Sequence, residues 1–160
     1  MIVLFRALTY GTLFVGLLLV FVPDRILIQA GIVRPAVIGP IQIAGMLVVV
    51  AGAALALASI LTFAFVGKGT PAPFDPPRKL VIAGPYRWVR NPMYIGAGLV
   101  LLGAAMFYGS FGLALYTVAF WSMAHLFVLF YEEPTLRKKF GPEYEAYIAS
   151  RRRWMPRWRS

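Results

Sequence analysis

Three long stretches without a charged side chain constrain this chain more than any other feature. They cover residues 7–22, 37–66 and 93–130, and they are 16, 30 and 38 residues long. A helix needs about 20 apolar residues, at roughly 1.5 Å per residue, to cross about 30 Å of hydrocarbon. The sequence GSFG at residues 109–112 divides the third stretch and is typical of a hairpin tip. We therefore predict an all-α integral membrane protein with about four transmembrane helices, near residues 5–22, 40–66, 93–108 and 113–131.

The composition agrees with this fold class and excludes several kinds of site. The chain is 60% apolar and 14% charged, whereas a soluble domain is about half apolar and about a quarter charged. It has no cysteine and a single histidine, His125, which excludes disulfides, thiolate metal sites and a histidine cluster. We expect no bound metal and a single membrane domain over residues 1–160.

The basic residues predict how the helices are oriented. There are 16 Lys and Arg against 6 Asp and Glu, and five of the basic residues lie in residues 67–91 and eight after Tyr131. Because basic loops stay in the cytoplasm, we expect a multi-pass protein with both termini cytoplasmic, in a bacterial-type inner membrane. The positive charge is then explained by the lipid bilayer as partner, since no nucleic-acid recognition motif is present. Arg6 before an apolar stretch would also fit a signal peptide, but residues 20–24 lack a small-residue cleavage pattern, so we expect a retained helix.

Small residues are frequent in the second and third predicted spans. Gly45 and Gly52 lie in the second, and Gly96, Gly98 and Gly103 in the third. Helices in lipid associate through close backbone contact at such residues. We interpret these glycines as packing residues, because spacing alone assigns them no chemistry.

A helix start at the membrane surface is the first candidate for a binding site. Asn91 followed by Pro92 is typical of an N-cap and a first helical position. The free N–H groups of such an end attract anions, and Arg87 and Arg90 stand beside it. The same residues also fit an ordinary capped helix at the membrane interface.

An acidic pair closes the fourth predicted span and forms the second candidate. Because the hairpin returns to the same side of the membrane, Glu132 and Glu133 should lie near the helix start at Asn91. His125 precedes Glu132 by seven residues, which predicts the same helical face about 10 Å deeper. His125 is either a proton acceptor or a hydrogen-bonded packing residue in the interior of the bundle.

Two sequence motifs resemble those of the isoprenylcysteine carboxyl methyltransferase and phospholipid methyltransferase superfamily. They are GPYRWVRNPMYIG at residues 84–96 and, after the hairpin, EEPTLRKKFGPEYEAYIASRRRWMP at residues 132–156. Members are multi-span membrane enzymes that use S-adenosylmethionine. The resemblance implies a cofactor site made by segments 78–96 and 131–156, with Glu133 and His125 as catalytic candidates. The implied cofactor-binding residues are Leu80, Val81, Tyr86, Arg90, Asn91, Pro92, Met93, Tyr94, Gly96 and Glu132.

The sequence departs from the family pattern at two positions. The family histidine before the proline is Asn91 here, which can donate a hydrogen bond but carries no charge. Prenylcysteine-type members tend to have an arginine about one turn before the glutamate pair, and Val128 occupies that region. The implied reaction moves a methyl group from S-adenosylmethionine to a lipid-like or small apolar acceptor: a prenylcysteine carboxylate, a lipid amine or a thiol. The alternatives are a catalytically inactive member that binds cofactor or lipid, and a structural membrane protein.

The C-terminal residues permit two interpretations. A short cytoplasmic helix should begin at Gly141 and Pro142, with Tyr144 and Tyr147 at helical spacing. Five arginines and two tryptophans follow at residues 151–159. This composition indicates an anchor on anionic lipid, a lid over the cofactor pocket, or both.

Overall fold

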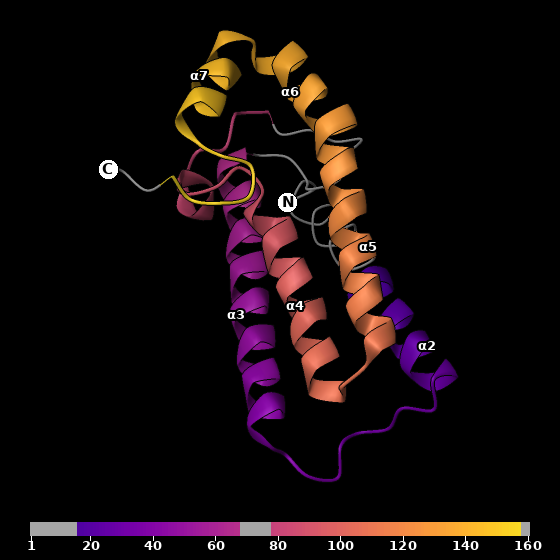
Figure 1. Ribbon diagram of the computed structural model, residues 1–160. Helices are drawn as coiled ribbons and strands as arrows, with labels where there is room; N and C mark the ends of the chain where they lie inside the picture. Colours follow the sequence, from indigo (N-terminus) through magenta and orange to yellow (C-terminus); the bar gives the residue numbers. More distant parts are fainter. Residues whose placement is uncertain (1–15, 68–77, 158–160) are drawn as a thin grey trace.

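The computed structural model describes residues 16–67 and 78–157, and every regular element in these ranges is a helix. Three long helices, α3 (Pro40–Thr62), α4 (Pro92–Tyr108) and α5 (Phe111–Phe127), run side by side. The shorter α2 (Val22–Gln29) packs against α5, and α6 (Glu133–Phe140) and α7 (Pro142–Ser150) lie at one end of the bundle (Figure 1). The all-helical prediction is confirmed for this part of the chain.

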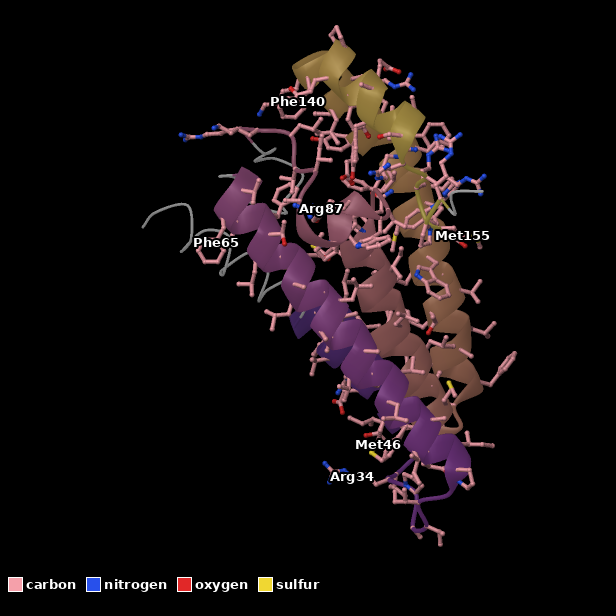
Figure 2. All side chains as sticks on the ribbon, turned by 90° about the vertical axis from the view of Figure 1, so that its left-hand side faces the viewer. Arg34, Met46, Phe65, Arg87, Phe140 and Met155 are labelled. Atoms are coloured by element: carbon pink, nitrogen blue, oxygen red, sulfur yellow. The ribbon has the colours of Figure 1, made fainter. Side chains whose placement is uncertain are left out.

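The outer faces of the long helices are apolar. Two continuous helices, Pro40–Gly67 and Phe111–Phe140, are long and apolar enough to cross a membrane, whereas α4 is apolar but only 17 residues long. Side chains such as Met46 and Phe65 project outward from α3 and the π-helical turn that extends it, η2 (Phe63–Gly67) (Figure 2). Large apolar side chains that face outward are expected where lipid, rather than water, surrounds a helix.

Paired glycines bring the antiparallel helices α3 and α4 into backbone contact. A Cβ atom added at Gly52 would lie 2.7 Å from the carbonyl oxygen of Gly96, and one added at Gly103 would lie 2.6 Å from that of Gly45. The two pairs are seven residues apart on each helix, which places both on one face. The packing role predicted for these glycines is therefore confirmed.

A two-residue turn joins α4 to α5, as the GSFG sequence predicts. Gly109 ends α4 with a φ of +60°, a left-handed conformation that glycine adopts without strain. Ser110 then caps α5, because its Oγ accepts a hydrogen bond of 3.2 Å from the N–H of Leu113. The hairpin carries the end of α5 back to the start of α4.

Two helices continue past the ends that were predicted for the first and fourth spans. The first span was expected to stop at residue 22, and its residues 5–15 lie outside the described part, but the helix continues through Pro23 to Gln29. The fourth was expected to close at Tyr131, yet it continues to Phe140 through a π-helical turn, η4 (Val128–Glu132). Pro23 and Pro134 both lie in the first turn of an α-helix that follows a π turn, where a missing N–H costs little.

Candidate functional site

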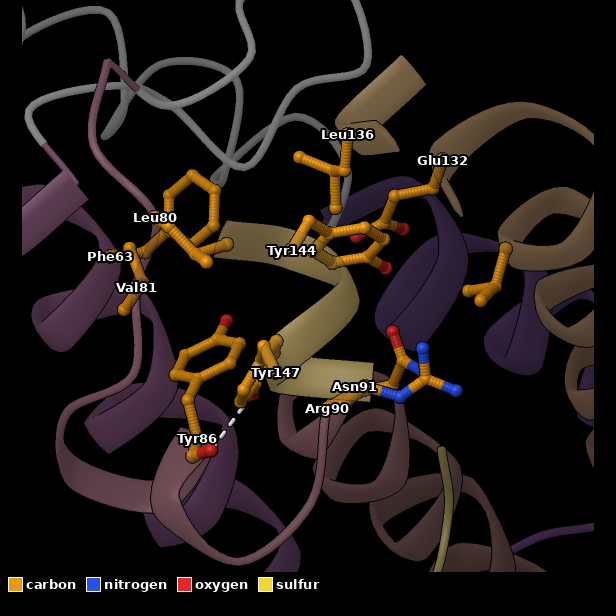
Figure 3. A pocket seen from close by; sticks show the side chains of 11 residues that line it. Phe63, Leu80, Val81, Tyr86, Arg90, Asn91, Glu132, Leu136, Tyr144 and Tyr147 are labelled. Atoms are coloured by element: carbon orange, nitrogen blue, oxygen red, sulfur yellow. Dashed lines mark hydrogen bonds between the residues drawn. The ribbon is translucent and has the colours of Figure 1, made fainter. Parts of the chain in front are cut away.

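A small cavity lies where the start of α4 meets the end of η4. Its volume is about 30 Å³. Arg90, Asn91 and Glu132 lie on one side of it, and Phe63, Leu80 and Val81 lie on the other (Figure 3). The lining residues are Phe63, Leu80, Val81, Tyr86, Arg90, Asn91, Val128, Glu132, Leu136, Tyr144 and Tyr147. The site thus offers a charged half and an apolar half to one ligand.

The guanidinium of Arg90 is buried with unused hydrogen-bonding capacity. Its side chain is 7% exposed, and its Nη1 atom lies 3.1 Å from Oε1 of Glu133. Neither Nη1 nor Nε makes a hydrogen bond of acceptable geometry to any described residue. Buried donors are nearly always satisfied, so two such N–H groups beside a cavity indicate a missing acceptor.

The start of α4 adds further donors beside Arg90. Asn91 occupies the N-cap position, as predicted, but the expectation that its side chain caps the helix is wrong. Its Nδ2 instead donates a hydrogen bond of 3.4 Å to the carbonyl oxygen of Arg153. Pro92 has no N–H, and the N–H of Ile95 donates to the carbonyl oxygen of Asn91. The N–H groups of Met93 and Tyr94 are therefore the ones in this turn that no side-chain cap uses and that could bind an anion.

The two glutamates lie together but have different surroundings. Glu132 lines the cavity, and its Oε2 accepts a hydrogen bond of 3.2 Å from the hydroxyl of Tyr94. Glu133 does not line the cavity and is bound by Arg90 and Arg153. Arg153 holds it through two hydrogen bonds, from Nε at 2.6 Å and from Nη2 at 3.0 Å. Glu132 thus faces the cavity, while Glu133 pairs with both arginines, and its single negative charge leaves the group of three with a net positive charge.

Three buried tyrosines form much of the remaining wall. Burial raises the pKa of Tyr86 and Tyr147 well above the usual range, and burial together with the Glu133 carboxylate raises the pKa of Tyr144 to about 12. The Tyr147 hydroxyl donates a hydrogen bond of 2.8 Å to the carbonyl oxygen of Tyr86 (Figure 3). These phenols stay neutral at physiological pH, so their part of the cavity wall carries no charge.

Residues 151–154, here called the strap, lie across the start of α4. The backbone N–H groups of Arg90 and Asn91 donate to the carbonyl oxygens of Arg152 and Arg153, at 3.0 and 3.3 Å. Arg151 donates through Nε to the carbonyl oxygen of Arg87. The strap is therefore bonded to residues that precede it by more than 60 positions in the sequence.

His125 also contacts the strap and lies away from the cavity. Its Nδ1 accepts a hydrogen bond of 3.1 Å from the indole Nε1 of Trp154. The π turn η4 lies between His125 and Glu132 and rotates the register, because a π turn holds one residue more than an α turn. The prediction of a common face assumed a regular α-helix between the two residues, and His125 is not among the residues that line the cavity.

The comparisons with known proteins identify the family. The family model described as phospholipid methyltransferase matches residues 41–143, which is more than half of the chain. The chain belongs to the phospholipid methyltransferase family. The family and the apolar helices together make the protein a membrane methyltransferase. A search of curated protein sequences finds no match.

The matched region of this methyltransferase contains most of the cavity. Nine of the eleven lining residues fall within residues 41–143, and the other two are Tyr144 and Tyr147. Six residues that the sequence singled out as cofactor contacts line the cavity: Leu80, Val81, Tyr86, Arg90, Asn91 and Glu132.

Other predicted site residues lie around the methyltransferase cavity rather than in its wall. Pro92, Met93 and Tyr94 form the first turn of α4, and Tyr94 reaches the site through Glu132. Gly96 packs against Ala56, since a Cβ added to it would lie 2.6 Å from the Ala56 nitrogen. The catalytic candidates Glu133 and His125 are outside the lining as well.

Sequence reasoning missed five of the lining residues. Phe63 and Val128 lie in apolar stretches in which no pattern distinguishes one wall residue from its neighbours, and Leu136 is a single apolar side chain between Thr135 and Arg137. Tyr144 and Tyr147 did carry a signal, because they belong to the FGPEYEAY segment that resembles the family pattern and recur at helical spacing. Their place in the wall follows from the return of α7 over the cavity.

Proposed function

We propose that this protein transfers a methyl group from S-adenosylmethionine to a lipid-like or small apolar acceptor at the membrane. The observation that carries the proposal is the buried Arg90 guanidinium, whose Nε makes no hydrogen bond to a described residue and whose Nη1 has only the ion pair with Glu133 at 3.1 Å. It lies beside the uncapped start of α4 and shares a cavity with Glu132. This combination suits a ligand that bears both a carboxylate and a positive charge.

The residues present fit the parts of that methyl donor. Arg90 and the first-turn N–H groups of α4 would hold its carboxylate. Glu132 would accept hydrogen bonds from its ammonium group or its ribose hydroxyls. Phe63, Leu80 and Val81 provide an apolar surface for its adenine. When bound, S-adenosylmethionine supplies an electrophilic methyl group on a positively charged sulfur.

The contribution of the protein to the reaction is mainly placement and exclusion of water. An acceptor that is already an anion needs only in-line approach, which the wall of buried tyrosines can enforce once the site is closed. An amine or thiol acceptor must first lose a proton. Because Glu133 and His125 are engaged by Arg153 and Trp154, we propose Glu132 or water as the proton acceptor in place of them.

The acceptor would approach through the bilayer, along the apolar outer faces of the helices. The candidates are a prenylcysteine carboxylate, a lipid amine and a thiol. Val128 lines the cavity in the region where prenylcysteine-type members tend to have an arginine. Among the described lining residues Arg90 is the arginine, and we assign it to the carboxylate of the donor. An acceptor carboxylate would therefore have no second arginine in this lining, so a lipid amine or a thiol is favoured.

We also propose four transmembrane spans with both termini in the cytoplasm of a bacterial-type cell. The support is the distribution of charge, since α6, α7 and the start of α4 bring basic residues to one end of the bundle (Figure 2). Reporter fusions should place residue 70 and residue 160 inside and residue 109 outside. An external signal from the fusion at residue 70 would reject this topology.

The function is tested by donor binding and by methyl transfer on the purified protein in nanodiscs. Calorimetry should detect S-adenosylmethionine, and Arg90→Gln should weaken binding by about tenfold or more, because a charge-assisted hydrogen bond is lost. Arg87→Gln is the matched control, since Arg87 is exposed and does not line the cavity. Equal affinity of Arg90→Gln and wild type would place the donor elsewhere.

The methyl-labelled donor identifies the acceptor class when it is offered together with a farnesylcysteine analogue, a lipid amine or a thiol. Label in the amine or thiol and little in the farnesylcysteine would support the proposed preference. Methyl esterification of the farnesylcysteine alone would overturn it. Binding of the donor without transfer to any acceptor would favour a cofactor-binding member that has lost catalysis.

A further inference from the structure

The cavity is too small for the ligand that its residues suit. Its volume of about 30 Å³ leaves room for only a few water molecules, since one water needs about 10–15 Å³ of such space. Pockets for ligands of the size of a nucleoside span about 300–1,000 Å³. Part of the wall must therefore move before a methyl donor can enter.

The wall made by α7 and the strap is the part built to move as a unit. It begins at Gly141, whose φ of +50° and ψ of −124° are readily adopted only by glycine. It contributes Tyr144 and Tyr147 to the cavity and then crosses the start of α4. α3 and α4, in contrast, are locked by backbone contact at their paired glycines.

The strap is fastened to the rest of the site mainly by side chains. Arg153 forms two hydrogen bonds to Glu133, the same carboxylate that lies 3.1 Å from Arg90. Trp154 donates to His125 on α5. The side chain of Glu133 is 6% exposed and therefore needs a positive partner. Arg90 remains in that role when Arg153 leaves. Release of Arg153 thus opens the strap without leaving a buried charge unpaired.

We infer that the strap is a latch over the methyl-donor site and that Arg153 is its positioning residue. The closed latch holds Glu133 against Arg90 and fixes the Arg90 guanidinium beside the cavity, and the open latch admits the donor. This inference rests on the proposed function for the identity of the ligand. The strap itself lies beyond the residues 41–143 that match the family model.

Hydrogen exchange tests the latch without any reaction. The N–H groups of Arg90 and Asn91 donate to the strap carbonyls, so their exchange reports strap opening. Arg153→Gln should speed exchange at both positions by about tenfold or more, since a charge-assisted pair is lost. Arg153→Lys, which keeps the charge but not the paired geometry, should give an intermediate rate. Unchanged exchange in Arg153→Gln would overturn the inference.

Two controls separate the latch from a general loss of structure. Arg157→Gln removes another tail arginine, whose Nη1 donates only to the carbonyl oxygen of Ala149 in the described part, and it should leave exchange at residues 90 and 91 unchanged. The N–H of Ala114, at the opposite end of α5, should exchange at the wild-type rate in all three variants. Faster exchange at Ala114 in Arg153→Gln would mean unfolding rather than release of the strap.

A covalent clamp tests whether the donor needs the latch to open. The chain has no cysteine, so His125→Cys with Trp154→Cys allows a short bismaleimide to join the strap to α5. Linking before the donor is added should prevent uptake of labelled S-adenosylmethionine, and linking afterwards should slow its release. The double variant capped with a monofunctional maleimide is the control. Equal uptake with and without the link would overturn the latch.

The donor itself separates failure of the latch from failure of the proposed function. Saturating S-adenosylmethionine should slow exchange at residues 90 and 91 of the wild-type protein, because the strap closes over it. Donor binding with no change in that exchange would overturn the latch. If the wild type binds no donor by calorimetry, the proposed function fails, and the exchange of Arg153→Gln still decides whether Arg153 holds the strap.

Discussion

The two ends of the helical bundle are stabilised in different ways. Along α3 and α4 the contacts are backbone against backbone, at the glycine pairs 45 with 103 and 52 with 96. At the end where α6 and α7 lie, the contacts are ion pairs and hydrogen bonds between distant segments, around a cavity. Close packing needs no water and suits lipid, whereas the charged groups need either partners or solvent.

This difference separates a rigid scaffold from an adjustable site. Backbone contact between helices has one geometry, so the start of α4 is held at a fixed position. Hydrogen bonds between side chains can be exchanged one at a time, so the strap can release while the scaffold stays intact. We expect substitutions at the two ends to separate the stability of the bundle from binding of the donor.

The largest effect should follow from Glu133→Ala at the polar end. Removal of the carboxylate leaves the Arg90 guanidinium, which is 7% exposed, without its charged partner. Loss of one member of a buried ion pair costs about 3–5 kcal/mol of the free energy of unfolding. Chemical denaturation in detergent measures this change, and donor affinity should fall as well.

The exposed ion pair of Arg137 with Glu145 is the matched control for that substitution. It has an N–O distance of 3.3 Å, and its side chains are 53% and 56% exposed. Because water screens such a pair, Glu145→Ala should cost about 0–1 kcal/mol. If the two variants lost the same free energy of unfolding, burial would not distinguish these glutamates, and the polar end would not depend on its buried ion pair.

A smaller loss should follow from Gly52→Ala in the packed region. The added Cβ would lie 2.7 Å from the carbonyl oxygen of Gly96, which is backbone and cannot rotate away. Overpacking of this kind costs about 1–3 kcal/mol, more than the gain in helix propensity from glycine to alanine. Ala53→Leu, on the exposed face of α3, is the control and should change stability little. A more stable Gly52→Ala protein would contradict the close packing of α3 on α4.

At alkaline pH, the polar end should lose stability before the packed region of α3 and α4 does. The pKa of Tyr144 is raised to about 12 by burial and by Glu133, against an ordinary value of about 10. Because the pKa of Tyr144 is higher in the folded than in the unfolded protein, this tyrosine contributes fully to the free energy of unfolding below pH 10. That contribution is lost as the pH rises toward 12. Tyr144→Phe should reduce that part of the pH dependence. Identical alkaline unfolding of Tyr144→Phe and wild type would assign the effect to other groups.

The sequence predicted the helices of the bundle better than their ends. The charge-free lengths and the GSFG break were sufficient for α3, α4 and α5, because lipid imposes one simple requirement on a spanning segment. The first and fourth spans were predicted to end near residues 22 and 131, but both helices continue, and Pro23 and Pro134 each lie in the first turn of an α-helix that a π turn precedes. A π turn depends on packing of neighbouring segments and leaves no periodic signal in the sequence.

The candidate site was predicted where charge and connectivity determined it. The return of the hairpin placed Glu132 and Glu133 near Arg90, and the structure brings them together. The sequence did not predict what each of these residues binds. Arg153 pairs with Glu133, and Trp154 with His125, only because the chain turns back after α7. Contacts between segments so far apart follow from the fold and not from local spacing.

The smallest effect should come from Ser110→Ala, at the opposite end of the bundle from the cavity. The Ser110 side chain caps α5 by accepting a hydrogen bond from the N–H of Leu113, and it is 3% exposed. Loss of such a cap costs about 1 kcal/mol. Because the substitution lies far from Arg90 and the strap, donor affinity and hydrogen exchange at residues 90 and 91 should remain at wild-type values. Calorimetry and thermal unfolding of the same preparation measure both quantities. A change in donor affinity equal to the change in stability would show that the scaffold and the site are one cooperative unit, and the two ends would then not be separable.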